Sequence, residues 1–285
     1  MPAQPDPPDG TARPTRHGPG RPLGRATAAG RDAGTDNDPQ RADGWTGLHA
    51  AAAAGPFFVV DELRPEQRWL PLCEFADHPD GLAGRVAATL ESPLLQPLHR
   101  GTPHAVVLRV AASVAFLGLA ARLVSPAIGS ALSAGIVPAM SWDRLHWRPI
   151  PTGVVPLACG PVEGQVIDPG SATNPAALLS DSVDPVLALG TTVADRYGLS
   201  DRIVQGNVAS AIAGAAVAVA RSGRCTERAA GHLTTALLRQ PGMAGSGSLV
   251  GPDGTAPRLR RNSCCLLYRA GGGLCGDCIL AGAGR

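Results

Sequence analysis

An apolar stretch in the first half of the chain constrains the fold more than any other feature. Residues 105–121 are apolar nearly all round, with Arg109 near the start and Arg122 directly after the stretch. A helix that is apolar on every side has to be enclosed by other apolar groups. The stretch is shorter than the roughly 20 apolar residues of a membrane span. We therefore expect a core helix over 105–123, surrounded by other helices, and no transmembrane segment; peripheral membrane association stays open.

The rest of the pattern predicts an α+β fold, mainly helical with a small irregular β layer. Apolar positions at helical spacing predict helices over residues 82–90, 184–197, 203–220 and 227–239. Ser125 followed by Pro126 fits an N-cap and a proline at the first helical position, which predicts a separate helix through residue 134 that Gly135 ends. The run FFVV at 57–60 predicts a buried strand, and the short runs between prolines at 144–166 predict the β layer.

Composition divides the chain into three parts. Residues 1–44 are dense in Pro, Gly, Asp and Arg with almost no aliphatic side chains, which predicts a disordered N-terminal arm. Residues 45–250 form the mainly helical domain. Residues 241–257 predict a flexible connector, so that 251–285 comprise a linker and a C-terminal cysteine-rich metal-binding segment.

Charge and motifs exclude several functional classes. A formal net charge of +2 and a pI near 8.2 are too mild for a protein that tracks nucleic-acid phosphates, so we expect no nucleic acid as a partner. The N-terminus lacks the basic and apolar regions of a secretory signal, which predicts a cytoplasmic protein. The sequence also contains no GxxxxGK[ST], HExxH or GxSxG motif.

Four of the seven cysteines lie within the last 22 residues: Cys264, Cys265, Cys275 and Cys278. In a reducing compartment such crowding indicates a metal site rather than disulfides. Four thiolates are what either a [2Fe-2S] cluster or a structural zinc ion takes from a protein. The solitary Cys73, Cys159 and Cys225 are expected to be small buried side chains.

The adjacent pair Cys264 and Cys265 favours the cluster over zinc. Neighbouring side chains of an extended chain point to opposite faces, so convergence of this pair requires a turned backbone. Zinc ligands are usually separated by two to four residues, whereas the Cys275-x-x-Cys278 turn suits either metal. The glycines at 271–273 would let backbone amides approach the sulfurs.

The segment RLRRNSCCLLYRAGGGLCGDCIL, residues 258–280, resembles the C-terminal motif of the FhuF-like ferric-siderophore reductases. Nine residues separate the two cysteine pairs here, one fewer than in that family's pattern. The short segments at 120–123, 125–127 and 206–210 are also similar to the family. The resemblance implies that all four cysteines bind a [2Fe-2S] cluster. It further implies one-electron reduction of a ferric siderophore in the cytosol, with electrons from a cytosolic donor.

Several other residues have more than one interpretation. Arg258, Arg260, Arg261 and Arg269 flank the cysteines, and either raise the cluster potential, attract an anionic chelate or acidic donor, or are solvated surface residues. Trp142, His146 and Trp147 either pack on the core or line a substrate cleft. Asn207 and Ser210 either bridge helices or report a polar pocket. Two other functions stay open: a non-catalytic protein with a structural zinc site made of four cysteines, and an electron-transfer protein for another redox partner.

Overall fold

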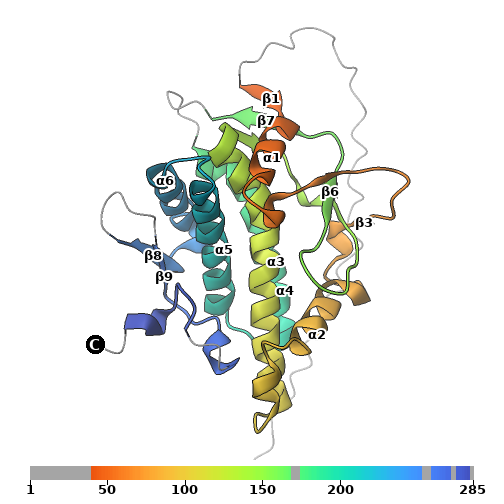
Figure 1. Ribbon diagram of the computed structural model, residues 1–285, viewed down its shortest axis with the longest axis vertical. Helices are drawn as coiled ribbons and strands as arrows, with labels where there is room; N and C mark the ends of the chain where they lie inside the picture. The colour runs from red at the N-terminus through yellow and green to blue at the C-terminus, as the bar shows by residue number, and fades with distance from the viewer. Residues whose placement is uncertain (1–39, 168–173, 252–257, 271–273, 283–285) are drawn as a thin grey trace, which may run out of the picture. The chain divides into compact units, whose positions relative to one another are not determined.

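The computed structural model describes residues 40–167, 174–251, 258–270 and 274–282. The described residues belong to one compact unit. Its α-helices, in chain order, are α1 (Gly44–Ala52), α2 (Gly84–Leu90), α3 (His104–Ala134), α4 (Pro175–Tyr197), α5 (Asp201–Arg221) and α6 (Glu227–Leu238). Helix α3 packs against α1, α2, α4 and α5, and Figure 1 shows it among them. The α+β, mainly helical class predicted from the sequence is confirmed.

Helix α3 is a single helix of 31 residues, so the separate helix predicted from Pro126 is wrong. The Ser125 hydroxyl donates to the Ala121 carbonyl within the helix instead of capping a new one. Pro126 has no amide hydrogen, so one hydrogen bond of the helix is missing at this position. Residues 122–131 of α3 are buried throughout, and this packing on all sides keeps the helix continuous. The helix ends where predicted, at Gly135 in the left-handed conformation with φ 66°.

Helices α3 and α5 are both long and apolar enough to cross a membrane, with mean hydropathies of 1.9 and 1.7 over their most apolar windows. The expectation that the apolar stretch of α3 is too short to span a membrane is therefore wrong. However, 61% and 72% of those windows are buried inside the protein, as in the core helices of a soluble protein. The burial supports the interpretation of both as core helices.

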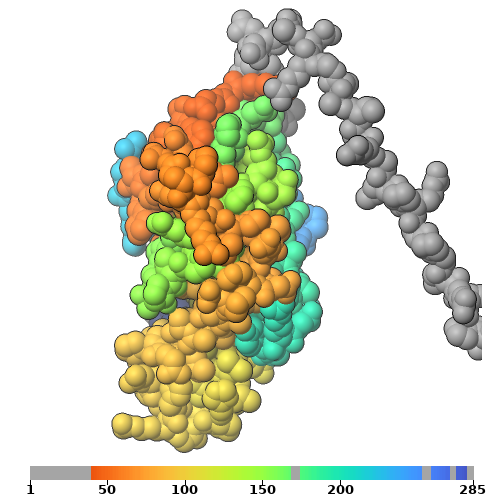
Figure 2. Space-filling model, turned by 90° about the vertical axis from the view of Figure 1, so that its right-hand side faces the viewer, coloured from red at the N-terminus to blue at the C-terminus, as the bar shows by residue number. Residues whose placement is uncertain are grey.

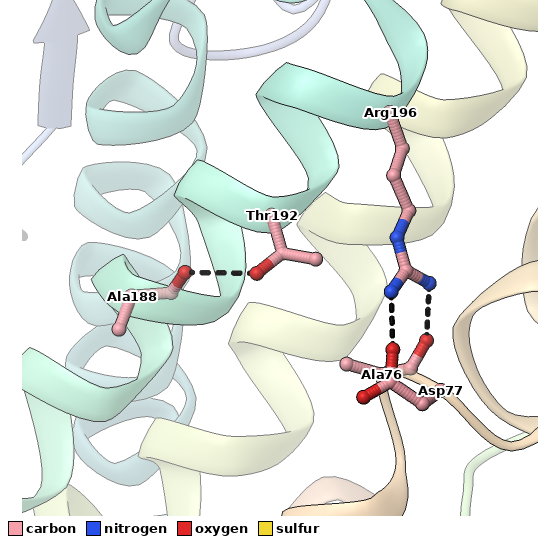
Figure 3. A network of polar contacts seen from close by, with 5 residues as sticks. All are labelled: Ala76, Asp77, Ala188, Thr192 and Arg196. Carbon is pink, nitrogen blue, oxygen red and sulfur yellow. Dashed lines mark hydrogen bonds and ion pairs between the residues drawn. The ribbon is translucent and has the colours of Figure 1, made fainter. Parts of the chain in front are cut away.

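The other helices follow the predicted periodicity with shifted ends. Helix α4 begins at Pro175, nine residues before the expected start, because the Asn174 side chain caps it by accepting from the Ala176 amide. Near its other end, Arg196 donates to the Ala76 carbonyl and forms an ion pair with Asp77, as Figure 3 shows. This contact ties α4 to the loop that follows the short turn η2 (Leu72–Glu74).

The β layer consists of short strands beside the helices. One antiparallel sheet has the order β1 (Arg41–Asp43), β7 (Glu163–Val166), β4 (Ile136–Pro138). A second has the order β2 (Asp61–Glu62), β6 (Leu157–Cys159), β5 (Leu145–Trp147), β3 (Leu70–Pro71). Figure 2 shows the face where the orange segment carrying β2 and β3 lies against the light-green strands β5 and β6.

The strand predicted for 57–60 is wrong. Residues Pro56–Phe58 form a 3-10 turn, η1, and only Phe58 and Val60 of the run are buried. The buried guanidinium of Arg122 donates to the carbonyls of Phe57 and Val59, at 2.8 and 2.6 Å, and to that of Val155 at 2.6 Å. These bonds satisfy the carbonyls that a strand would have paired in a ladder.

Strand β1 and the start of α1 lie inside the range predicted as a disordered arm. Arg41–Asp43 pair with β7, and the Asp43 carboxylate accepts from the Trp45 amide as the N-cap of α1. The remainder of the predicted arm, up to residue 39, lies outside the described residues. The domain limits at 44 and 250 stay predictions.

The predicted connector contains a strand. Residues Gly247–Val250 form β8, which pairs in antiparallel register with β9 (Arg258–Arg261), Gly247 opposite Arg261. Residues 252–257 lie outside the described part of the chain. The hairpin packs on α5 and α6, as Figure 1 also shows, and it holds the start of the cysteine segment against the helices.

Candidate metal centre

Strand β9 packs on helix α5 and precedes the cysteine segment. Its side chains alternate, so that Arg258 and Arg260 are exposed whereas Leu259 and Arg261 are buried. Gly206 of α5 permits the close approach, because a Cβ there would lie 2.1 Å from the Ser263 hydroxyl and 2.7 Å from the Arg261 guanidinium. The segment 206–210, already singled out by its sequence, thus contacts the strand that precedes the cysteines.

After this strand the structure brings one cysteine from each half of the motif into contact. Cys265 and Cys278 are 1% and 4% exposed, whereas Cys264 and Cys275 are partly exposed. The Cys265 thiol donates to the Cys275 sulfur, with 3.6 Å between the two Sγ atoms. Cys278 closes the C-x-x-C turn by donating its amide to the Cys275 carbonyl at 3.0 Å. One buried and one partly exposed cysteine therefore come from each half of the motif.

The backbone turns immediately after the adjacent cysteine pair. Leu266 has φ 68°, and within the described ranges it is the only residue other than glycine with a positive φ. This conformation is costly for a branched side chain and persists where surrounding contacts impose it. The turn lets the Leu266 amide donate to the Cys264 sulfur at 3.3 Å, as the Leu280 amide does to the Cys278 sulfur at 3.4 Å. Amide hydrogen bonds of this kind tune the potential of a thiolate-bound cluster.

Burial raises the pKa of the thiols of Cys264 and Cys275. It raises the pKa of Cys275 to about 12, with the neighbouring Cys265 and Cys278 adding to the increase. It also raises the pKa of Cys264, against the lowering effect of the hydrogen bond from the Leu266 amide. Because thiolates are the metal-binding form, a metal entering this site must displace protons and supply the compensating positive charge.

Arg261, at the end of β9, is 1% exposed. Its backbone amide donates to the Asp277 carbonyl at 3.1 Å, which joins strand β9 to the Cys275-x-x-Cys278 turn. Its Nη2 makes two long contacts of 3.4 Å, to the Ile203 carbonyl and the Ser263 hydroxyl. Its Nε and Nη1 find no hydrogen-bond partner among the described residues. Burial lowers the pKa of Arg261, and the charges of Cys265, Cys275, Asp277 and Cys264 oppose that effect.

Two core helices hold Cys265 from the other side. The Ser113 hydroxyl of α3 donates to the Cys265 carbonyl at 2.8 Å, and Asn207 of α5 donates to the Ser113 carbonyl and hydroxyl at 3.0 and 3.2 Å. All three residues are buried. Of the two interpretations of Asn207, the structure supports the bridge between helices. Sequence reasoning missed Ser113, whose one signal is a hydroxyl within an apolar helical run.

The other predicted site residues lie farther from the thiols or on the surface. Arg269 is exposed, with its Nε donating to the Tyr268 hydroxyl at 3.2 Å. Trp147 is buried against Phe75, with 4.7 Å between the ring centroids, which supports the core interpretation for Trp147. Together with Arg258 and Arg260 on β9, Arg269 keeps its proposed electrostatic role as a prediction.

The three solitary cysteines differ from one another. Cys159 is buried, and this raises the pKa of its thiol to about 11. Cys225 is partly exposed. Cys73 is exposed, so the expectation of a buried side chain is wrong for it, because the short turn η2 buries only Leu72.

The comparison with protein families agrees with the geometry. Residues 261–278 match the model of the FhuF 2Fe-2S C-terminal domain, a range that contains all four crowded cysteines and Arg261. No curated protein matches the chain. The match indicates an iron-sulfur protein whose cofactor is a [2Fe-2S] cluster. Four cysteines, two of them buried, are a donor set that fits this cofactor. Among the described residues, Cys265 and Cys275 are in direct contact, and no three His, Cys, Asp or Glu side chains are grouped to hold one metal ion.

Proposed function

We propose that this protein binds the [2Fe-2S] cluster through Cys264, Cys265, Cys275 and Cys278, and that it reduces ferric siderophores in the cytosol. The contact between Cys265 and Cys275 carries the ligand assignment, because it joins the two halves of the motif. The match at 261–278, together with the similarity of 258–280 to the FhuF-like ferric-siderophore reductases, supports the reaction.

The sulfur separation fits two ligands of one iron. With metal–thiolate bonds of about 2.3 Å, two ligands of a tetrahedral metal lie about 3.8 Å apart, and the Sγ atoms of Cys265 and Cys275 are 3.6 Å apart. A [2Fe-2S] cluster needs two such pairs, whereas zinc needs four thiolates around one ion. Cys264 and Cys278 would form the second pair.

The position of the site suits electron transfer to a docked chelate. Cys264 and Cys275 are partly exposed, so the centre reaches the protein surface. A polar cavity of about 370 Å³ is lined by Ser263, the residue before Cys264 in the chain, and by Arg202, Gln205, Ser246 and Asn262 among others. Hydrogen-bonding side chains of this kind suit the oxygen-rich surface of a siderophore. The exposed Arg258, Arg260 and Arg269 would attract an anionic chelate or an acidic electron donor.

The reaction releases iron by changing its charge. The bound cluster supplies one electron at a time. Each ferric ion takes up one electron and becomes ferrous, and a cytosolic one-electron donor replaces that electron. Ferric iron is a hard ion that oxygen donors hold tightly, and ferrous iron leaves them more readily, so reduction frees the metal from the siderophore.

Two measurements test this proposal. Purified protein should contain about two iron and two sulfide per chain, and serine at any of the four proposed ligands should bleach the visible spectrum. Serine at Cys73, Cys159 or Cys225 provides the matched control and should leave the spectrum intact. One zinc without sulfide, or equal loss at all seven positions, would contradict the ligand assignment.

The second measurement addresses the substrate. Chemically reduced protein should be reoxidised by a ferric hydroxamate, catecholate or citrate chelate. Ferrous iron should then appear in a ferrous-specific chelator at about one per cluster, because a cluster of this type delivers one electron. Reoxidation by oxygen but by none of the three chelates would leave an electron-transfer protein for another redox partner.

A further inference from the structure

Among the four arginines that flank the cysteines, Arg261 alone is buried. Its neighbours on β9, Arg258 and Arg260, face solvent because strand side chains alternate. An unpaired charge inside a protein costs several kcal/mol, so a buried guanidinium needs a carboxylate or a full set of acceptors, as the three carbonyls bound by Arg122 show. In the described part of the chain, the one ion pair between acidic and basic side chains is Arg196 with Asp77, so Arg261 has no carboxylate partner.

The cysteines near the Arg261 guanidinium can supply the negative charge that a carboxylate partner would otherwise provide. Nε and Nη1 have no acceptor among the described residues, and the two contacts of Nη2 are long, at 3.4 Å. The titratable groups whose charges act on this guanidinium are Cys265, Cys275, Asp277 and Cys264. Three of these four are proposed cluster ligands. Cysteines bind a cluster as thiolates, so a bound cluster would place negative charge beside this guanidinium.

We propose that Arg261 is the buried counter-charge of the cluster and a positioning residue that raises its midpoint potential; this inference rests on the proposed function. A cluster on four thiolates carries net negative charge, and that charge increases by one when an electron enters. A fixed positive charge beside the site therefore stabilises the reduced form more than the oxidised form. The exposed arginines do this far less, because water and salt screen them.

The packing shows that the guanidinium is held in place. Gly206 of α5 lies against it, and an added Cβ there would come within 2.7 Å of Nη2 and 2.9 Å of Nε. The Arg261 amide is bonded to the Asp277 carbonyl, so the backbone of this residue is also fixed to the second cysteine pair. A Gly206→Ala substitution would shift the guanidinium without removing its charge.

The test measures midpoint potential in the iron-loaded protein by redox titration, followed by visible absorption and electron paramagnetic resonance. Arg261→Gln should lower the potential so that, at the wild-type midpoint, the ratio of reduced to oxidised cluster falls at least tenfold. This corresponds to about 59 mV for one electron. Arg261→Lys, which keeps the charge, should recover part of the shift, and Gly206→Ala should change the potential because it displaces the guanidinium.

Arg260→Gln is the matched control, because it removes the same charge from the adjacent, exposed position of the same strand. Its shift should be several-fold smaller and should vanish at high salt. A purely structural role of Arg261 instead predicts lost iron and sulfide, with an unchanged potential in the remaining clusters. Loss of iron and sulfide with an unchanged potential would overturn the proposal. Equal shifts for Arg260→Gln and Arg261→Gln, or an unchanged potential in Gly206→Ala, would overturn it as well.

If the Arg261 variants do not retain a cluster, the midpoint potential of Gly206→Ala tests whether the position of the guanidinium affects the cluster. Wild-type protein without iron and sulfide would refute the proposed function itself. The two failures are therefore distinguishable.

Discussion

Removing one hydroxyl group, in Ser113→Ala, tests how the core helices hold the cysteine segment. Ser113 Oγ is buried and donates to the Cys265 carbonyl at 2.8 Å. Its loss leaves that carbonyl without this bond, and a buried acceptor left unsatisfied costs about 1–3 kcal/mol. Asn207 also loses one of its two acceptors. Most of the cost should weaken the docking of the segment, because the Ser113 side chain contacts it directly.

The expected consequence is faster loss of the cluster. A docking equilibrium weakened by about 1–3 kcal/mol opens roughly 5 to 150 times more often, since 1.4 kcal/mol corresponds to a factor of ten. Removal of iron by a strong chelator that acts on the opened state should accelerate by the same factor. The assay follows the decay of visible absorbance under excess chelator, alongside thermal unfolding of the same samples.

Ser130→Ala is the matched control on the same helix. Ser130 Oγ is equally buried and donates to the Ile136 carbonyl at 2.6 Å. It lies 17 residues farther along α3, about 25 Å at 1.5 Å per residue. This variant should lose similar thermal stability but keep the wild-type cluster lifetime. Equal rates of cluster loss in the two variants, or a wild-type rate in Ser113→Ala, would refute the reasoning.

Two further predictions concern the fold around the site. Arg122→Met should lower the free energy of unfolding in urea by about 3 kcal/mol or more, because three carbonyls lose a charged donor. The exposed Arg196→Met should cost less than about 1 kcal/mol, and equal costs for the two would contradict the burial argument. Deleting residues 1–44 should destabilise the protein by about 1 kcal/mol or more relative to deleting 1–39. The longer deletion removes β1 and the Asp43 cap of α1, so identical melting temperatures of the two truncated proteins would contradict this.

Local pattern determined much of the chemistry. The crowding of Cys264, Cys265, Cys275 and Cys278 indicates a thiolate-bound metal because few other roles bring four thiols so close in sequence. The need for a turned backbone after the adjacent pair also follows from the sequence, and Leu266 provides that turn. The apolar run at 105–121 indicates a core helix, because an all-apolar surface has to be enclosed.

Tertiary structure decided which residues act together. Ser113 and Cys265 are 152 residues apart in sequence, and a local pattern contains no information about such a contact. Which of four similar arginines is buried depends on the register of β9 against β8 and on the face that packs on α5, so a shift of one residue would bury Arg260 instead. Likewise, burial on all sides lets α3 continue through Pro126, where local preference alone would start a new helix. Long-range packing outweighs local preference at these positions, because each local preference is worth only about 1–3 kcal/mol whereas burial acts on the whole element.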